Sequence, residues 1–293
     1  MRTTLLGILN ITPDSFSPGT AYYERVLPAV DRIMTMVEDG AHIIDLGAEA
    51  MCPGSQRISP HEEQERLSIV LDPLTEKREK LGMDFKISID TRNPSTAEWA
   101  IHHGADIIND VSACAEAEMK EVLARHTQVP YIFMHNLGTP PDKNTVMPRN
   151  QDIVAGISLW GRRKIQELAQ AGIAEQRVIF DPGIAFGKTA QQSLDLIHRA
   201  EEFHALGIPL CYGHSRKTYV APYENLPVPK RDELTAGFSQ HLAHAGVQYL
   251  RVHDVKTNAM TLRHGADVIL HDNWYADFSA GLTRRSAKRD IEV

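Results

Sequence analysis

The sequence predicts an α/β protein built as a single-domain (β/α)8 TIM barrel. Short runs rich in Ile, Val and Leu alternate with longer amphipathic stretches along the 293 residues. The runs are apolar throughout, which is typical of parallel strands buried on both faces. Glycines precede several of these runs, where they are expected to end the preceding helices. Eight such units favour a closed barrel, and a doubly wound open sheet is the second possibility.

Each expected strand is a short apolar run between polar or glycine-containing joints. In chain order the strands are expected at 4–10, 42–47, 86–90, 106–110, 131–135, 178–181, 209–213 and 249–254. Amphipathic periodicity predicts helices after them at 23–39, 60–81, 94–103, 115–126, 152–171, 191–205, 232–245 and 256–265. Because no linker divides the chain, residues 1–272 are assigned to one barrel and 273–293 to a C-terminal tail that we expect to be partly disordered.

Composition narrows the classes of partner. The net charge of −7 argues against a nucleic-acid partner, and the basic cluster Arg284, Arg285, Lys288 and Arg289 is confined to the tail. The three cysteines show no CxxC spacing, which suits a reducing cytoplasm. No apolar run reaches the length of a membrane span. We therefore expect a cytoplasmic protein that contacts neither membrane nor nucleic acid.

Polar side chains recur where the expected strands end, and the carboxyl ends of barrel strands are where active sites gather. These residues are Asn10, Asp45, Asp90, Asn109, His135, Asp181, Ser215, Arg216, Lys217, Arg251 and His253. Asp110 and Asp254 are interpreted as helix caps, and Asp45 suits either role. Carboxylates and amides together favour a flat, nitrogen-rich heterocycle, because each can form paired hydrogen bonds with ring N–H and amine groups.

Two other chemistries find less support in the sequence. Histidine-based metal catalysis lacks an HExxH or comparable spacing, and pairs such as His102 and His103 fall in expected helices. The segment GHSRK around Ser215 lacks the second glycine of a GxSxG nucleophile elbow. A binding pocket at the strand ends therefore explains the polar residues best.

Seven segments in order resemble the dihydropteroate synthase family. They are GILNITPDSFS, IIDLGAE followed by PG, ISIDTRNPSTAEWAIHHGADIINDV, MHNLGTP, DPGIAFGKT, GHSRKT and RVHDV, and they extend from about Gly7 to Ala266. The resemblance implies a (β/α)8 barrel that joins 6-hydroxymethyl-7,8-dihydropterin pyrophosphate to p-aminobenzoate in folate biosynthesis, with Mg²⁺. It also implies a homodimer.

The resemblance assigns roles to individual residues. It implies pterin binding by Asp90, Asn109, Met134, Asp181, Phe186, Lys217 and Arg251. Lys217, Arg251 and His253 take the catalytic positions, and Asn10 faces the metal and the pyrophosphate. On the acceptor and pyrophosphate side it implies Phe16, Pro53, Arg57, Ser215 and Thr218.

The second loop departs from the family pattern. Where the family reads Gly-Glu-Ser-Thr-Arg-Pro-Gly, this chain has residues 48–54 as AEAMCPG, so Met51 and Cys52 replace the threonine and arginine. Arg57 is a candidate replacement for that arginine, and a solvent-facing role suits it equally. Ala185 also stands where glycine is usual. A pterin-binding paralogue with another acceptor or none therefore remains open. A corrinoid-linked methyltransferase of the same superfamily, suggested by DTRN at 90–93, is disfavoured by Lys217 and RVHD.

Overall fold

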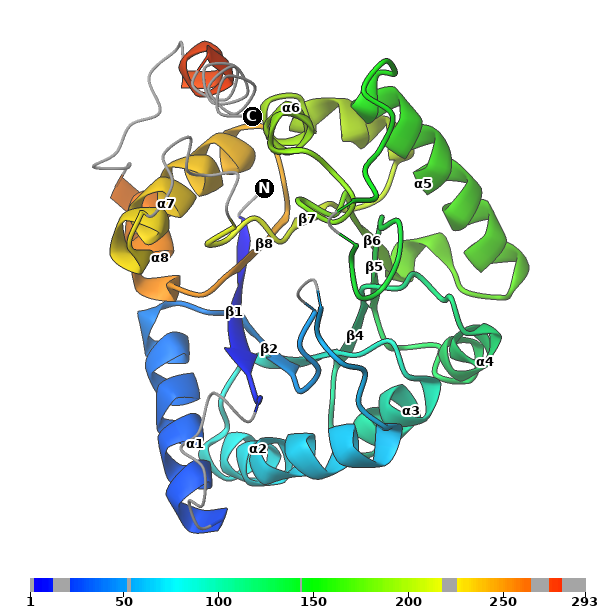
Figure 1. Cartoon of the computed structure of the whole chain (residues 1–293). Coiled ribbons are helices and arrows are strands. Elements are labelled where there is room, and N and C mark those ends of the chain that lie inside the picture. Colours follow the sequence, from blue (N-terminus) through cyan, green and yellow to red (C-terminus); the bar gives the residue numbers. More distant parts are fainter. Residues whose placement is uncertain are drawn as a thin grey trace.

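Eight parallel strands form a barrel surrounded by helices in the computed structural model (Figure 1). The structure describes residues 3–12, 22–51, 54–142, 144–217, 226–264 and 274–280. The strand order is β6-β5-β4-β3-β2-β1-β8-β7, and every adjacent pair is parallel. A bridge between Phe180 and Leu210 joins the two end strands and closes the ring. The predicted (β/α)8 barrel is confirmed.

The elements follow the expected order closely. The strands are β1 (Thr4–Asn10), β2 (Ile43–Gly47), β3 (Lys86–Asp90), β4 (Ile107–Asp110), β5 (Tyr131–Met134), β6 (Val178–Asp181), β7 (Cys211–Tyr212) and β8 (Tyr249–Val252). The helices are α1 (Tyr22–Asp39), α2 (Pro60–Leu81), α3 (Pro94–His102), α4 (Ala117–Arg125), α5 (Ile153–Gln170), α6 (Ala190–His198), α7 (Val228–His244) and α8 (Val255–His264). Short 3-10 helices, η2 (Glu175–Arg177) and η3 (Ala200–Leu206), precede β6 and β7.

The largest difference from expectation is near α6. The helix expected at 191–205 is divided, because α6 ends at His198 and the chain continues as η3. The start of α6 is fixed by a capping box, in which the Thr189 hydroxyl accepts from the Gln192 N–H and the Gln192 side chain accepts from the Thr189 N–H. The first residue of α6 is thus determined by these local hydrogen bonds, which the apolar periodicity does not reveal.

Part of the expected C-terminal tail packs on the barrel. Residues 274–280 are helical and lie beside α6 and α7 (Figure 1). Trp274 is buried and makes edge-to-face contacts with Phe238 of α7 and His198 of α6. This segment therefore extends the folded part of the chain past residue 272, while residue 273 and residues 281–293 lie outside the described residues.

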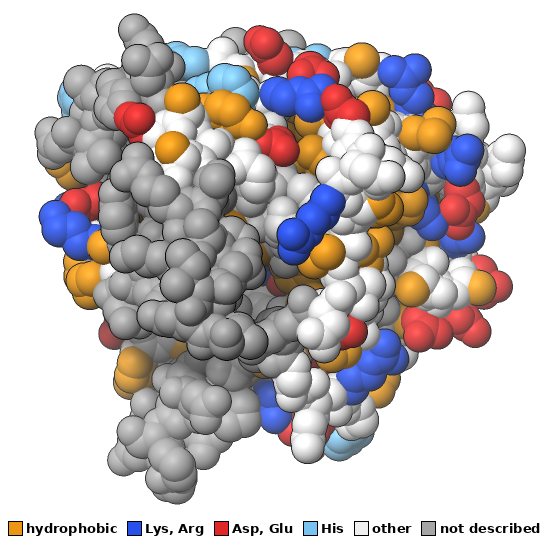
Figure 2. Space-filling model, turned by 45° about the horizontal axis from the view of Figure 1, so that its top comes forward, with side chains coloured by type: hydrophobic (Ala, Val, Ile, Leu, Met, Phe, Trp, Pro, Cys, Tyr) orange, Lys and Arg blue, Asp and Glu red, His pale blue; other side chains and the backbone are white. Residues whose placement is uncertain are grey.

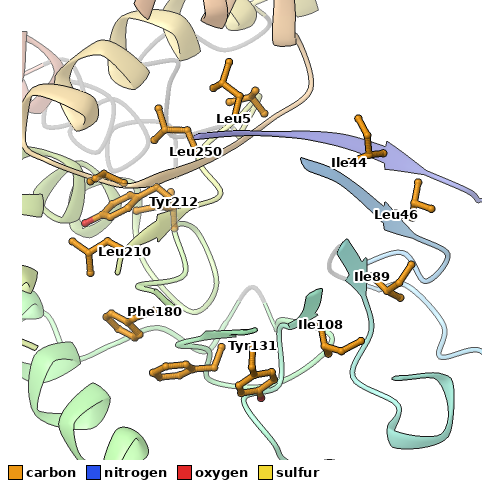
Figure 3. Close-up of a cluster of buried hydrophobic side chains, with 14 of the residues drawn as sticks. Leu5, Ile44, Leu46, Ile89, Ile108, Tyr131, Phe180, Leu210, Tyr212 and Leu250 are labelled. Carbon is orange, nitrogen blue, oxygen red and sulfur yellow. The ribbon is translucent and has the colours of Figure 1, made fainter. Parts of the chain in front are cut away.

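Side chains alternate between the two faces of the barrel wall. The outward-facing residues pack under the helices in one large cluster (Figure 3), which includes Leu5, Ile44, Leu46, Ile89, Ile108, Tyr131, Phe180, Leu210, Tyr212 and Leu250. The inward-facing residues form a second, smaller cluster of Leu6, Ile43, Ile107, Ile132, Ile179 and Cys211. Because strand side chains repeat every second residue, both faces are apolar in the lower part of the barrel.

The next inward layer of the barrel is mostly polar. Two residues farther along the strands, the inward positions carry Asp45, Asn109, Met134, Asp181, Gly213 and Arg251, and Asp90 takes the same position on β3. The register places Asp90 beside Asn109 and Met134 beside Asp181. The period of the strands therefore gathers the polar side chains at the carboxyl ends, above an apolar floor.

Charges of both signs are interspersed among the coloured residues on the face that Figure 2 shows, without a broad basic field. Among the residues described, no helix is both long and apolar enough to cross a membrane.

Candidate active site at the carboxyl ends of the strands

Arg251 of β8 joins two acidic strand ends. Its Nε donates to Asp45 Oδ2 at 2.5 Å and its Nη2 donates to Asp90 Oδ2 at 2.6 Å. Burial raises the pKa of Asp90 to about 7. The positive charge of Arg251 lowers this pKa, and the negative charge of Asp45 raises it. The two carboxylates raise the pKa of Arg251, so its guanidinium stays charged. Asp90 is the group here that titrates near neutral pH.

Asp45 holds the neighbouring polar side chains in place through hydrogen bonds. Its side chain is fully buried and its Oδ1 accepts from the Ser88 hydroxyl at 2.6 Å. Asn109 Nδ2 also lies 3.3 Å from Asp45 Oδ1, which leaves the Asn109 Oδ1 as an acceptor. Asp45 thus orients Arg251 and Asn109 and caps no helix. Asp110 was expected to cap a helix, but it accepts from the N–H groups of Ser112 and Cys114 in the loop after β4, and the residue at the start of α4 is Glu116.

Asp181 is held at the end of β6 by backbone groups. Its Oδ1 accepts from the Gly183 N–H at 2.7 Å and its Oδ2 from the Gly213 N–H at 3.2 Å. Burial raises the pKa of Asp181, while the positive charge of Lys217 lowers it. Each carboxylate oxygen keeps a second lone pair, so Asp181 can accept two further parallel hydrogen bonds from a ligand.

Gly183 allows the chain after β6 to lie against the chain after β5. A Cβ at this position would be 1.9 Å from the His135 carbonyl oxygen, and the φ of +70° suits glycine. His135 itself was expected in the pocket, and that expectation is wrong. Its ring lies against Trp160 of α5, with 4.8 Å between centroids, and its Nδ1 is 2.9 Å from Lys188 Nζ.

Lys217 and Phe186 form one wall of the site. Lys217 Nζ lies 4.6 Å from the centre of the Phe186 ring and donates to the Ile184 carbonyl at 2.5 Å. Burial lowers the pKa of Lys217 to about 8, against the effect of Asp181, which raises it. Lys188 supports this wall, because its Nζ donates to the Phe186 carbonyl at 2.8 Å and to the His135 carbonyl at 3.1 Å.

Ser215 and His253 lie together just past the ends of β7 and β8. The Ser215 hydroxyl accepts from the His253 N–H at 3.2 Å and lies 3.0 Å from His253 Nδ1, to which it can donate. Burial lowers the pKa of His253 to about 3, helped by the positive charges of Arg216 and Arg251. His253 is therefore neutral at physiological pH, and when Ser215 donates to Nδ1 the ring carries its N–H at Nε2. Arg216 forms an ion pair with Asp232, in which Nε donates to Oδ1 at 2.7 Å.

Asn10 offers a hard oxygen ligand at the end of β1. Its side chain is exposed, and Asn10 Oδ1 and Asp90 Oδ2 are each 3.7 Å from the point where a Cβ of Gly47 would lie. Both oxygens therefore lie close to Gly47, and Asp90 Oδ2 is the one that accepts from Arg251 Nη2. Oxygen ligands of this kind suit Mg²⁺, which binds few protein groups and keeps its remaining ligands for water or phosphate.

The second loop is fixed at its base. Glu49 forms a buried, two-point ion pair with Arg92, at 2.8 and 2.9 Å. Farther along the loop, Arg57 is exposed and donates to the Thr139 carbonyl at 2.6 Å. Arg57 thus joins the second loop to the loop after β5. Four residues singled out from the sequence lie outside the described residues: Phe16, Cys52, Pro53 and Thr218.

The structure brings most of the expected residues together and adds some that sequence reasoning missed. The added residues are Ser88, Glu49, Arg92 and Lys188. Ser88 could have been found, since it precedes Asp90 by two residues on the same strand face. The Glu49–Arg92 pair carries no local signal because the two residues are 43 apart, and Lys188 carries none because His135 lies 53 residues away.

The fold and the site define a barrel enzyme that binds a small polar heterocycle at its strand ends. The family model described as "Pterin binding enzyme" matches residues 6–253, and the chain belongs to this family. Named relatives are dihydropteroate synthases, which are transferases. The protein from Synechocystis is 36% identical over 260 residues, which cover 88% of this chain and 87% of that protein.

Two further relatives are also named as dihydropteroate synthases. A probable bifunctional folylpolyglutamate synthase/dihydropteroate synthase from Halobacterium salinarum is 36% identical over 263 residues, which cover 89% of this chain but only 31% of that protein. The solved dihydropteroate synthase from Anaplasma phagocytophilum, with bound 6-hydroxymethylpterin-monophosphate, has a TM-score of 0.80 and 31% identity over 90% of this chain and 98% of that chain.

Proposed function

We propose that this protein is a dihydropteroate synthase. It would condense 6-hydroxymethyl-7,8-dihydropterin pyrophosphate with p-aminobenzoate and release pyrophosphate. One observation carries the proposal: Asp90, Asn109, Asp181 and Arg251 occupy a single inward layer, with Lys217 over Phe186 at its side. This arrangement combines paired acceptors, an amide and cations around a slot that suits a flat ring.

Recognition of the pterin follows from the available lone pairs. Asp181 has one free lone pair on each oxygen and can accept from a ring N–H and an exocyclic amine together. Asn109 supplies an acceptor from β4. Phe186 and Met134 provide apolar walls, and the Arg251 guanidinium is a planar group that can cover one ring face.

Transfer needs the departing pyrophosphate to be stabilised. The bond between the exocyclic pterin carbon and the pyrophosphate oxygen breaks, the amine nitrogen bonds to that carbon, and the amine loses a proton. Arg251 and Lys217 supply positive charge, and His253 supplies an N–H donor beside Ser215. Phe16, Pro53, Arg57 and Thr218 are proposed to border the acceptor and pyrophosphate positions.

Mg²⁺ is the proposed cofactor, held by Asn10 with Asp90 nearby. The position of Asn10 Oδ1 and Asp90 Oδ2, both close to Gly47, supports this assignment. When bound, Mg²⁺ would neutralise charge on the pyrophosphate. Asn10 would orient the ion, and Asp90 would keep Arg251 in place through its 2.6 Å hydrogen bond.

A pterin-binding paralogue with another acceptor is the second candidate. Met51 in the position of a family threonine favours it, because its thioether cannot replace a hydroxyl donor. Incubation with the dihydropterin pyrophosphate and p-aminobenzoate separates the two. Formation of dihydropteroate with one pyrophosphate per product supports the synthase. Tight pterin binding without product supports the paralogue.

We also infer that the protein is a cytoplasmic homodimer. The family resemblance supports a homodimer, which light scattering of the purified chain would test. The absence of CxxC spacing among the three cysteines supports a reducing, cytoplasmic location.

A further inference from the structure

A second cluster of possible metal ligands lies outside the barrel, where α3 meets α4. Glu98 and His102 of α3 and His126, directly after α4, each offer one ligand atom, and these atoms lie within 4.8 Å of one another. Both helices run back from the carboxyl ends of β3 and β4, so His102 and His126 lie toward the opposite end of the barrel from the candidate active site. We propose that this cluster, the α3–α4 site, binds a divalent transition-metal ion such as Zn²⁺.

His102 is held in the form that a metal requires. Its Nδ1 lies 2.8 Å from the Glu98 carbonyl oxygen. A carbonyl only accepts, so Nδ1 carries the proton and Nε2 keeps its lone pair. Metal-binding imidazoles are commonly oriented in this way, by donating the other ring N–H to a carbonyl or carboxylate.

Glu98 is also prepared as a ligand. Arg125 pairs with Glu98 Oε2 and lowers the pKa of the carboxyl, which is therefore ionised at neutral pH. This pairing leaves Glu98 Oε1 directed at His126 Nε2, 3.1 Å away. A bound ion would take the place of the proton between these two atoms, with Arg125 as the outer partner that orients the carboxylate.

The donor set indicates the kind of metal. Two imidazole nitrogens and one carboxylate form a known Zn²⁺ ligand set with a fourth position open to water. Mg²⁺ and Ca²⁺ prefer oxygen ligands throughout. The adjoining groove, lined by Glu98 and His102, also contains Glu118, Glu121 and Arg125, so acidic side chains outnumber the arginine near the site. A bound ion would connect α3 to α4 and stabilise the folded state.

Isothermal titration of the tag-free full chain with Zn²⁺, after treatment with a chelator, tests the proposal. We expect one saturable site per chain and a higher melting temperature with Zn²⁺. His102→Ala and His126→Ala each remove a ligand, so they should weaken binding by more than the roughly 10- to 100-fold that loss of an outer partner costs and should remove the thermal shift. Co²⁺ should give a visible absorption band in the wild type that both variants lose.

His103→Ala is the matched control. His103 lies next to His102, and its Nδ1 makes the same contact with a backbone carbonyl, that of Trp99 at 2.8 Å, but it lies outside the cluster. This variant should bind Zn²⁺ like the wild type. Absence of saturable binding, or equal affinity in the wild type, His102→Ala and His126→Ala, would overturn the α3–α4 site. Neither result depends on pterin chemistry, so the proposed function is tested separately.

Discussion

Arg251 and Asp90 lie 161 residues apart in the chain and are joined by a 2.6 Å hydrogen bond across the mouth of the barrel. Arg251 is shared with Asp45, so it does not fully offset the cost of burying Asp90, and the pKa of Asp90 is raised to about 7. On the opposite wall burial lowers the pKa of Lys217 to about 8. Two groups of opposite charge therefore titrate close to neutral pH.

The first prediction concerns pH. Asp90 loses its negative charge as the pH falls through about 7, and Lys217 loses its positive charge as the pH rises through about 8. We expect kcat/KM for the pterin substrate to be bell-shaped, with a maximum between these values. Lys217→Arg should move only the alkaline limb upward, because guanidinium keeps its proton. An alkaline limb that stays in place in Lys217→Arg would contradict this assignment.

The second prediction concerns pterin affinity. Lys217→Ala and Asp181→Asn should each abolish detectable dihydropterin binding by calorimetry, because they remove a cation or one of two paired acceptors. Asp181→Asn should also lower the free energy of unfolding by about 1–3 kcal/mol, since the amide cannot accept from both Gly183 and Gly213.

Exposed residues provide matched controls for these two variants. Lys230→Ala on α7 and Glu175→Gln in η2 change the same charges away from the site and should leave pterin affinity unchanged. Wild-type affinity in Lys217→Ala or Asp181→Asn would refute the site.

The third prediction concerns the metal. Pyrophosphate should bind more tightly with Mg²⁺ than without it, and Asn10→Ala should remove most of this difference. Asn10→Asp should preserve it, because a carboxylate oxygen is also a suitable ligand. Calorimetric titration of pyrophosphate with and without Mg²⁺ measures both effects. Equal affinities in the wild type under the two conditions would count against a metal at Asn10.

The fourth prediction concerns the second loop. Met51 and Cys52 lack the hydrogen-bond donors of the threonine and arginine that they replace, and charge-assisted hydrogen bonds contribute about 1.5–3 kcal/mol each. Wild-type turnover with p-aminobenzoate should therefore be slow and sulfonamide inhibition weak. Met51→Thr with Cys52→Arg should raise turnover roughly ten- to a hundred-fold and increase sulfonamide sensitivity. Met51→Leu with Cys52→Ala, which adds no donor, should change neither. Rapid wild-type turnover blocked by low sulfonamide would show that another group has replaced the family arginine.

The sequence predicts the barrel and most of the pocket because both depend on local patterns. Apolar runs locate the strands, and their polar ends locate Asp90, Asn109, Asp181 and Arg251. The runs do not show which side chains face inward, since most residues on both faces are apolar before the last residues of each strand. His135 follows Met134 and so faces outward, which explains why a polar residue at a strand end lies outside the pocket.

Other features depend on contacts between distant segments. Arg57 bonds to Thr139 across two loops, and Lys188 is fixed by His135 and Phe186. Nothing in the sequence near Lys188 shows that its ammonium is buried, because His135, which its Nζ contacts twice, lies 53 residues away directly after β5. Such residues require the folded structure to be found.

The junction of β6 with β7 has a consequence for motion. Within the described residues this seam has a single β-bridge, Phe180 to Leu210, supported by the Gly213 N–H on Asp181 and by Lys217 Nζ on the Ile184 carbonyl. Asp181 and Lys217, the two groups expected to hold the pterin, stand on opposite sides of it. A bound pterin therefore acts as an additional cross-link of the barrel wall. Amide hydrogen exchange at Tyr212 and Gly213 should be faster than in β2 or β3 without ligand and should slow when dihydropterin binds. Unchanged exchange on binding would mean that the wall is equally rigid when empty.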